Sequence, residues 1–143
     1  MAAGNKILVL GGLVMVFTTL LIPGDLLFAA SARTNYLLYC SGCHLVNGKG
    51  NHPNVPTLHN ELGRMMTVPA MREYLVRIPG AAQAPINDEE LSAVINWVLQ
   101  QWNADTLPAG FKKLTQAEVT AARQEILADP LRYRAQHWKD LPH

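Results

Sequence analysis

The residues that most directly indicate chemistry are two cysteines and a histidine in the run Cys40-Ser41-Gly42-Cys43-His44. Two thiols spaced in this way lie on one helical turn, where each can form a thioether with one vinyl group of the same porphyrin. The histidine that follows then directs its imidazole at the iron from one face. C-x-x-C-H is the attachment pattern of a c-type haem. The sequence therefore predicts one covalently attached haem c, held by Cys40 and Cys43, with His44 as an iron ligand.

Other uses of the cysteines fit the sequence less well. A zinc site built from Cys40, Cys43, His52 and His59 has enough ligands, but it leaves His44 without a role. A redox-active C-x-x-C pair is typical of a thioredoxin-like βαβ context, and no segment here alternates like a strand. With only two cysteines, the chain by itself makes neither a disulfide scaffold nor a four-cysteine metal site.

Length and composition restrict the remaining possibilities. A chain of 143 residues suits one domain, and an apolar fraction of 49% argues against disorder. The formal net charge of +1 gives no basic field, so no nucleic-acid partner is expected. Only 16% of the residues are charged, whereas about 25% is usual for a soluble domain. Part of this deficit lies at the N-terminus.

The N-terminus has the pattern of an export signal. Residues 7–24 carry no charge and follow Lys6, and the run Ala30-Ser31-Ala32 matches the small-residue pattern that a signal peptidase accepts. The alternative is an uncleaved membrane anchor. A spanning helix needs about 20 apolar residues, and the uncharged run of residues 7–24 is marginal for that length. Either reading assigns residues 1–32 to export or anchoring. Both place residues 33–143 outside the cytoplasm, most simply in a bacterial periplasm.

The rest of the chain shows helical periodicity, and we expect an all-α fold. The clearest helix spans residues 88–102, where Asn87 and Glu90 form a capping box. Its apolar side chains recur at helical spacing: Leu91, Val94, Ile95, Val98, Leu99 and Trp102. Shorter helices are predicted over residues 31–40 and 69–78, over about 12 residues after a capping box at Thr115 and Glu118, and from Asp129-Pro130 onward. Residues 45–66 should be mostly loop.

Over residues 34–102 the chain resembles the class I cytochromes c. The resemblance rests on the C-S-G-C-H run, the Gly48-Lys49-Gly50 turn, the segment Val55-Pro56-Thr57-Leu58 and the closing helix from Leu91 to Trp102. It implies a cytochrome c fold over residues 33–102, with a helical C-terminal extension over residues 103–143. It also implies that the Pro56 carbonyl accepts a hydrogen bond from the His44 ring, and that Tyr36 or Tyr39 packs against Trp97.

The second axial ligand departs from the family pattern. Class I members usually supply a methionine from the loop before the last helix, but here that loop, Pro79 to Pro85, contains none. Three methionines precede it, Met65, Met66 and Met71, of which Met71 is the best placed. Alternatively, the distal face is open, holds water, or is met by Gln83 or by a histidine such as His52 or His59.

The choice of ligand separates the candidate functions. With a second strong protein ligand, we expect an exported monohaem carrier of single electrons between periplasmic partners, such as a dehydrogenase or an oxidase. With an open iron, a peroxidase-like enzyme or a gas sensor becomes the alternative. A third possibility is a haem with a mainly structural role. No acid–base pair or nucleophile stands out, since Glu89 and Glu90 belong to a helix start. Contact with a membrane is expected only if the N-terminal segment is retained.

The C-terminal extension carries enough apolar surface to pack. This surface comes from apolar residues that include Phe111, Val119, Ile126, Leu127, Leu131, Tyr133 and Trp138. We expect it to wrap the domain, with the four basic residues Arg123, Arg132, Arg134 and Lys139 on the solvent side. A docking arm for a redox partner is the alternative role.

Overall fold

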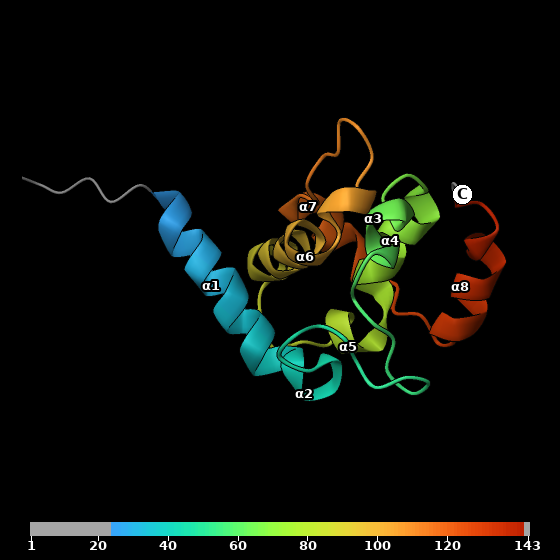
Figure 1. Cartoon of the computed structure of the whole chain (residues 1–143), viewed down its shortest axis with the longest axis horizontal. Helices are drawn as coiled ribbons and strands as arrows, with labels where there is room; N and C mark the ends of the chain where they lie inside the picture. The colour runs from blue at the N-terminus through green and yellow to red at the C-terminus, as the bar shows by residue number, and fades with distance from the viewer. Residues whose placement is uncertain (1–23, 142–143) are drawn as a thin grey trace, which may run out of the picture.

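The computed structural model describes the backbone of residues 24–141, and it describes side chains from Ala32 onward. Its helices are α1 (Gly24–Tyr39), α2 (Ser41–His44), α3 (Glu61–Met65), α4 (Pro69–Arg77), α5 (Pro79–Ala82), α6 (Asp88–Trp102), α7 (Gln116–Ala122) and α8 (Pro130–Trp138), with a 3-10 turn at Ala104–Thr106. The described residues form no β-strand, and their only β-bridge joins Asn51 to Val55. The all-α fold is therefore confirmed (Figure 1). Most of the predicted signal or anchor segment lies outside the described residues.

Helix α1 is longer than the sequence predicted. It begins at Gly24 rather than near residue 31, because residues 26–30 are leucine, phenylalanine and alanine and no proline or glycine follows Gly24 within the helix. The helix continues across position 32. Signal cleavage after Ala32 is tested by no feature of the fold and stays a prediction. Its C-terminal half packs across α6 (Figure 1), and the rings of Tyr36 and Trp97 lie 5.3 Å apart. The expected contact with Trp97 is thus confirmed for Tyr36, which is fully buried.

Helix α6 is the centre of the fold. The predicted capping box is present, since the Asn87 side chain accepts from the Glu90 backbone at 2.8 Å and the Glu90 side chain accepts from the Asn87 backbone at 3.0 Å. The predicted apolar stripe is buried except at its last member: Leu91, Val94, Ile95, Val98 and Leu99 are buried, and Trp102 is partly buried. Because α1 packs on one side of α6 and α7 on another, the core forms around this helix.

Two short helices interrupt segments that the sequence left as loop. Helix α3 falls inside the predicted loop of residues 45–66, and α5 begins the loop before α6. Both were missed because five and four residues are too few to show an apolar period. The prolines Pro69 and Pro79 occupy the first turns of α4 and α5, where a missing N–H removes no helical hydrogen bond.

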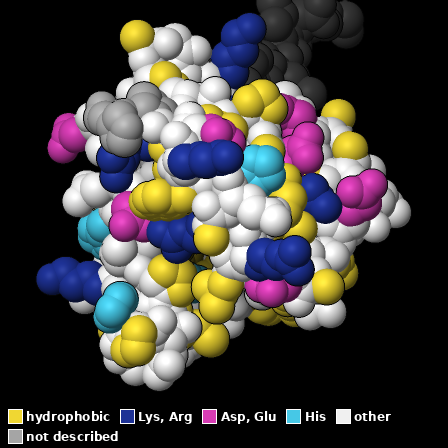
Figure 2. All heavy atoms as spheres, turned by 90° about the vertical axis from the view of Figure 1, so that its right-hand side faces the viewer, with side chains coloured by type: hydrophobic (Ala, Val, Ile, Leu, Met, Phe, Trp, Pro, Cys, Tyr) yellow, Lys and Arg dark blue, Asp and Glu magenta, His cyan; other side chains and the backbone are white. Residues whose placement is uncertain are grey.

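The C-terminal extension packs on the domain through both of its helices. The capping box of α7 at Thr115 and Glu118 is confirmed, but the helix has seven residues instead of about 12. Helix α8 begins as predicted, with Asp129 as its N-cap and Pro130 in its first turn. Helix α7 contacts α4 and α6, and α8 contacts α4. The face that carries α8 mixes acidic, basic and apolar side chains, and neither sign of charge gathers into a patch there (Figure 2).

Two arginines of the extension point toward the domain, which corrects the prediction that they face solvent. Arg123 pairs with Asp88 at 2.7 Å and donates to three backbone carbonyls, those of Ala82, Ala84 and Ile86, at 2.8–3.0 Å. Arg134 pairs with Glu61. A guanidinium presents five donors in a planar fork, so it satisfies several carbonyls that lack helical partners. Of the four basic residues predicted to face solvent, the other two, Arg132 and Lys139, are exposed as expected.

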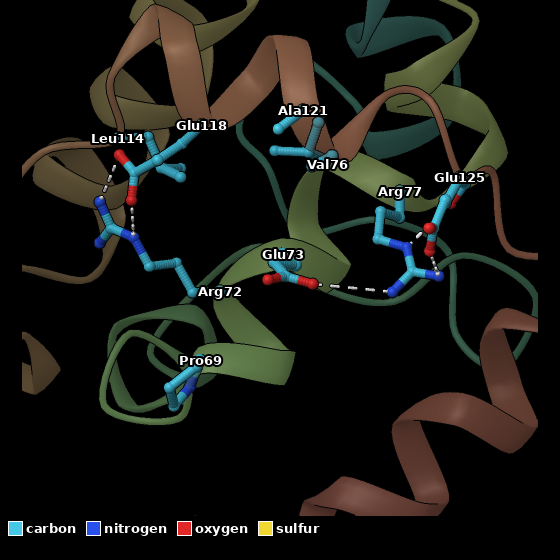
Figure 3. Close-up of a pocket in the computed structure, with 10 residues that line it drawn as sticks. Pro69, Arg72, Glu73, Val76, Arg77, Leu114, Glu118, Ala121 and Glu125 are labelled. Carbon is cyan, nitrogen blue, oxygen red and sulfur yellow. Dashed lines mark hydrogen bonds and ion pairs between the residues drawn. The ribbon is translucent and has the colours of Figure 1, made fainter.

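Arginines of α4 make the reciprocal contacts (Figure 3). Arg72 bonds the Glu118 carboxylate at 2.8 Å and also donates to the backbone carbonyls of Lys112 and Lys113, each at 2.9 Å. Arg77 donates to the Glu125 carbonyl at 2.8 Å. These contacts border a groove of about 390 Å³ between α4 and α7. The guanidinium groups at this groove are thus used in joining α4 to the extension.

Candidate functional site

The C-x-x-C-H run occupies one helical turn directly after α1. The Cys40 backbone N–H continues the α1 pattern by donating to the Tyr36 carbonyl at 2.9 Å. The Cys40 carbonyl then accepts from the backbone N–H groups of Cys43 and His44, at 3.2 and 3.0 Å. Both thiols are free, and Cys43 is exposed while Cys40 is partly buried. Burial, and next the neighbouring Cys43, raises the pKa of Cys40 to about 11. Both predicted attachment residues and the predicted ligand are therefore brought together.

The His44 ring is oriented by the segment that the resemblance pointed to. Its Nδ1 lies 3.1 Å from the Pro56 carbonyl oxygen, which confirms the implied contact. A carbonyl can only accept, so Nδ1 carries the proton and the lone pair of the neutral ring remains on Nε2. Burial lowers the pKa of His44 below its ordinary 6.5, while the bond to Pro56 acts in the opposite direction. The ring is therefore neutral near pH 7, the form that binds a metal.

Gly50 makes the approach of Pro56 possible. Its backbone N–H donates to the His44 carbonyl at 3.0 Å. A Cβ at this position would lie 2.5 Å from the carbonyl oxygens of Val55 and Pro56, and the φ of +67° is one that L side chains rarely adopt. Asn51 and Val55 exchange two backbone hydrogen bonds, at 3.0 and 2.9 Å, and so turn the chain back toward His44. Glycine is therefore required where the returning segment crosses the ligand.

Leu45, directly after the ligand, has an unusual backbone conformation. Its φ of 64° and ψ of 162° lie in a region used almost entirely by glycine, at a cost on the order of 1–3 kcal/mol for other residues. Its carbonyl accepts from the Tyr36 hydroxyl at 2.6 Å and from the Gly48 N–H at 3.2 Å. Burial, and next Cys40, raises the pKa of Tyr36 to about 12, so its hydroxyl stays protonated. The sequence identified Tyr36 only as a packing residue and gave no signal for Leu45.

Aromatic rings enclose Tyr36 and the turn after His44. The Trp102 ring lies 5.1 Å from the rings of Tyr36, Trp97 and His59. The same ring lies against Gly48, where a Cβ would be 2.6 Å from it. His59 Nε2 is 2.6 Å from the Asn47 carbonyl, which it must bond as a donor. His59, one of the candidate iron ligands, is therefore engaged with the turn that follows His44, through both its ring face and its nitrogen.

The candidate distal ligands lie on different elements. Met65 on α3 and Met71 on α4 are completely buried, and Met66 is 8% exposed. All three belong to the hydrophobic core cluster. Gln83, which follows α5, and His52 are exposed. Ligation by Met71 thus stays a prediction, since burial does not distinguish Met71 from Met65.

The donor set fits a haem better than it fits zinc. Nowhere in the described part of the chain do three or more histidine, cysteine, aspartate or glutamate side chains gather as a metal site. The zinc alternative needs Cys40, Cys43, His52 and His59 to converge, and they do not. What the structure provides is two free thiols on one turn and one neutral imidazole with an available Nε2. This is the donor set that two thioethers and one axial bond require.

Comparison with known proteins points in the same direction. A protein named cytochrome c-552 from Thermus thermophilus is 27% identical over 133 residues, covering 76% of this chain and 90% of that protein. A second cytochrome c-552 from Thermus thermophilus is 28% identical over 114 residues, covering 63% of this chain and 87% of its own length. No protein-family model matches the chain. Within residues 24–141, no helix is both long and apolar enough to cross a membrane.

Proposed function

We propose that the chain is a class I c-type cytochrome with one covalently attached haem c, and that it carries single electrons between redox partners outside the cytoplasm. Cys40 and Cys43 form the two thioethers, and His44 binds the iron through Nε2. When bound, the haem supplies a one-electron centre that alternates between ferrous and ferric iron. The observation that carries this proposal is the bond from His44 Nδ1 to the Pro56 carbonyl, because it fixes the tautomer that an axial ligand needs.

The chain's own residues prepare this site before any partner arrives. The Pro56 carbonyl restricts rotation of the His44 ring and increases the basicity of Nε2. Burial keeps the ring unprotonated, so no proton competes with the metal near pH 7. Gly50 ties the His44 carbonyl to the returning segment. Since the ligand's backbone and its ring are both held, a change of oxidation state requires little movement of the protein.

The surroundings of Cys43 support a docking face for transient partners. Cys43 is exposed, and large apolar side chains near it in sequence are also exposed: Leu38, Tyr39, Leu45 and Val46, at 65%, 42%, 44% and 72%. Weak redox encounters use small interfaces, below about 1,200 Å² in total. We propose that a periplasmic dehydrogenase or oxidase meets the protein here. Export rests on the N-terminal pattern of residues 1–32 and stays part of the proposal.

An open distal site is the second candidate, and one observation favours it. The loop from Pro79 to Pro85 contains no methionine, and its longest polar side chain, Gln83, points to solvent. An iron without a sixth protein ligand binds gases or peroxide, as in a peroxidase-like enzyme or a sensor. Absorption spectra of the reduced protein with and without carbon monoxide separate the candidates. A low-spin spectrum that carbon monoxide leaves unchanged supports the carrier, and a shifted spectrum supports the alternative.

The attachment itself is tested by mass spectrometry of the exported protein. The wild-type chain should carry the mass of one haem, retained after denaturation because thioethers are covalent. Cys40→Ala and Cys43→Ala each remove one thioether, and the double variant should retain no haem. Ser41→Ala, within the same turn, is the matched control and should retain full haem mass. A wild-type chain without haem mass would overturn the proposal.

A further inference from the structure

The turn that follows His44 depends on a hydrogen bond from a distant side chain. Leu45 has a backbone conformation suited to glycine, and its side chain is 44% exposed, so packing of that side chain does little to hold it. The carbonyl of Leu45 is bonded instead, by the Tyr36 hydroxyl at 2.6 Å and the Gly48 N–H at 3.2 Å. The first of these bonds spans nine positions of the chain. The conformation is therefore maintained by α1 and not by the turn alone.

Tyr36 is itself held firmly. Its side chain is fully buried, with the Trp97 ring at 5.3 Å and the Trp102 ring at 5.1 Å. Trp102 also lies against Gly48, the second donor to the Leu45 carbonyl. The two donors are thus fixed by one aromatic cluster, and that cluster is anchored on α6. Because the hydroxyl cannot swing away, the Leu45 carbonyl has a constant direction.

The conformation of Leu45 affects the iron ligand His44 through the backbone that follows it. The His44 carbonyl accepts from Gly50, and the His44 ring bonds Pro56, so both contacts come from the chain after the Leu45 turn. If Leu45 relaxed to a conformation that leucine prefers, the chain from Gly48 onward would leave in another direction. Gly50 and Pro56 would then lose their positions at His44.

We infer that Tyr36 is a positioning residue for the haem ligand, acting through its hydroxyl on the Leu45 carbonyl and thereby on the two contacts that orient His44. The inference rests on the proposed function, since it assigns a role toward the same haem. Packing of α1 on α6 requires only the aromatic ring at this position. The hydroxyl is the part of Tyr36 that serves the ligand.

The test compares three haem-loaded proteins in the reduced state. Tyr36→Phe keeps the ring and removes the hydroxyl, Tyr36→Phe with Leu45→Gly also removes the backbone strain, and Tyr39→Phe is the control on the exposed side of α1. Hydrogen exchange is followed by NMR at the His44 Nδ1–H and at the Gly48 and Gly50 amides, with α6 amides as the internal reference. The reduction potential of each protein is measured alongside.

In Tyr36→Phe we expect exchange at the three site protons to accelerate about five- to tenfold relative to the α6 amides, as loss of one net hydrogen bond implies. The reduction potential of Tyr36→Phe should also differ from that of Tyr39→Phe. Adding Leu45→Gly should return both the exchange rates and the reduction potential to the Tyr39→Phe values. If Tyr36→Phe matches Tyr39→Phe, or if all amides accelerate equally and Leu45→Gly restores nothing, the inference is wrong. A wild-type protein without haem overturns the proposed function instead, so the two failures are distinguishable.

Discussion

The side-chain amide of Asn103 donates to the backbone carbonyl of Leu58 at 2.8 Å, and so ties the end of α6 to the segment that leaves the haem-attachment site. The same side chain accepts through Oδ1 from the backbone N–H groups of Leu62 and Gly63, at 3.1 and 3.3 Å. Asn103 is 1% exposed, so water cannot replace these partners. One amide thus closes the loop between α2 and α3 onto the central helix.

Replacing this amide should destabilise the whole fold. Asn103→Ala leaves two buried backbone N–H groups and the partly buried Leu58 carbonyl without this partner, and we expect a loss of about 2–3 kcal/mol in the free energy of unfolding. Urea denaturation of the haem-loaded protein measures it. Asn54→Ala, at an exposed position of the 51–55 turn, is the control and should stay within about 0.5 kcal/mol of wild type. Equal stability of the two variants would contradict this role.

Arg123 should contribute a comparable amount to the free energy of unfolding, through hydrogen bonds that a lysine cannot form. Its guanidinium bonds three carbonyls between α5 and α6 and also pairs with Asp88. A single ammonium cannot span these acceptors, so Arg123→Lys should lower the free energy of unfolding by about 1–3 kcal/mol. Denaturant unfolding of Arg132→Lys, an exposed position on α8, provides the comparison and should show almost no change.

Acid should weaken the contact between α4 and α7. The hydrogen bond from Arg72, aided by Thr115, lowers the pKa of Glu118 from 4.5 to about 2. A carboxyl whose folded-state pKa is depressed contributes stability that is full above the unfolded value and is lost as pH falls through the folded one. The contribution should therefore disappear between about pH 4.5 and pH 2.

Glu118→Gln tests this pH dependence directly. The variant should be less stable than wild type at neutral pH, and the difference should shrink toward pH 2. Because the carboxylate is 44% exposed, solvent screening keeps the effect modest. Denaturant midpoints measured across this range give the result, and a difference that is constant with pH would contradict the assignment.

Gly50→Ala adds only one methyl group, but it should disrupt the backbone around His44. The added methyl would meet two carbonyl oxygens at 2.5 Å, and the φ of +67° is strained for alanine. We expect a loss of more than about 1 kcal/mol in stability and a lower yield of haem-loaded protein. The control is Gly80→Ala in α5, where nothing lies within 4 Å of the new methyl. That variant should load haem normally.

Met71→Leu should identify the second axial ligand. Leucine preserves most of the buried volume, so the fold should persist while the thioether is lost. If Met71 ligates the iron, the reduced protein changes from a low-spin spectrum to one that shifts with carbon monoxide. Met65→Leu and Met66→Leu serve as controls and should keep the wild-type spectrum. An unchanged spectrum in Met71→Leu eliminates this residue as the ligand.

The local sequence was sufficient to predict the elements whose signals are contiguous. The C-x-x-C-H turn, the α6 stripe with its Asn87 cap, and the starts of α7 and α8 follow from spacings of a few residues, because helix caps and helical periods are short-range properties. The placement of Pro56 at His44 came from the family resemblance, and the geometry confirms it.

Only the tertiary structure revealed how distant residues hold the site. The hydroxyl of Tyr36 on the Leu45 carbonyl, the Asn103 amide on Leu58, and the inward direction of Arg123 join parts of the chain separated by nine to 45 positions. A polar side chain looks the same in sequence whether it faces water or a buried carbonyl. Its partner is decided when the helices pack, because burial then removes water and leaves the protein's own donors and acceptors to satisfy one another.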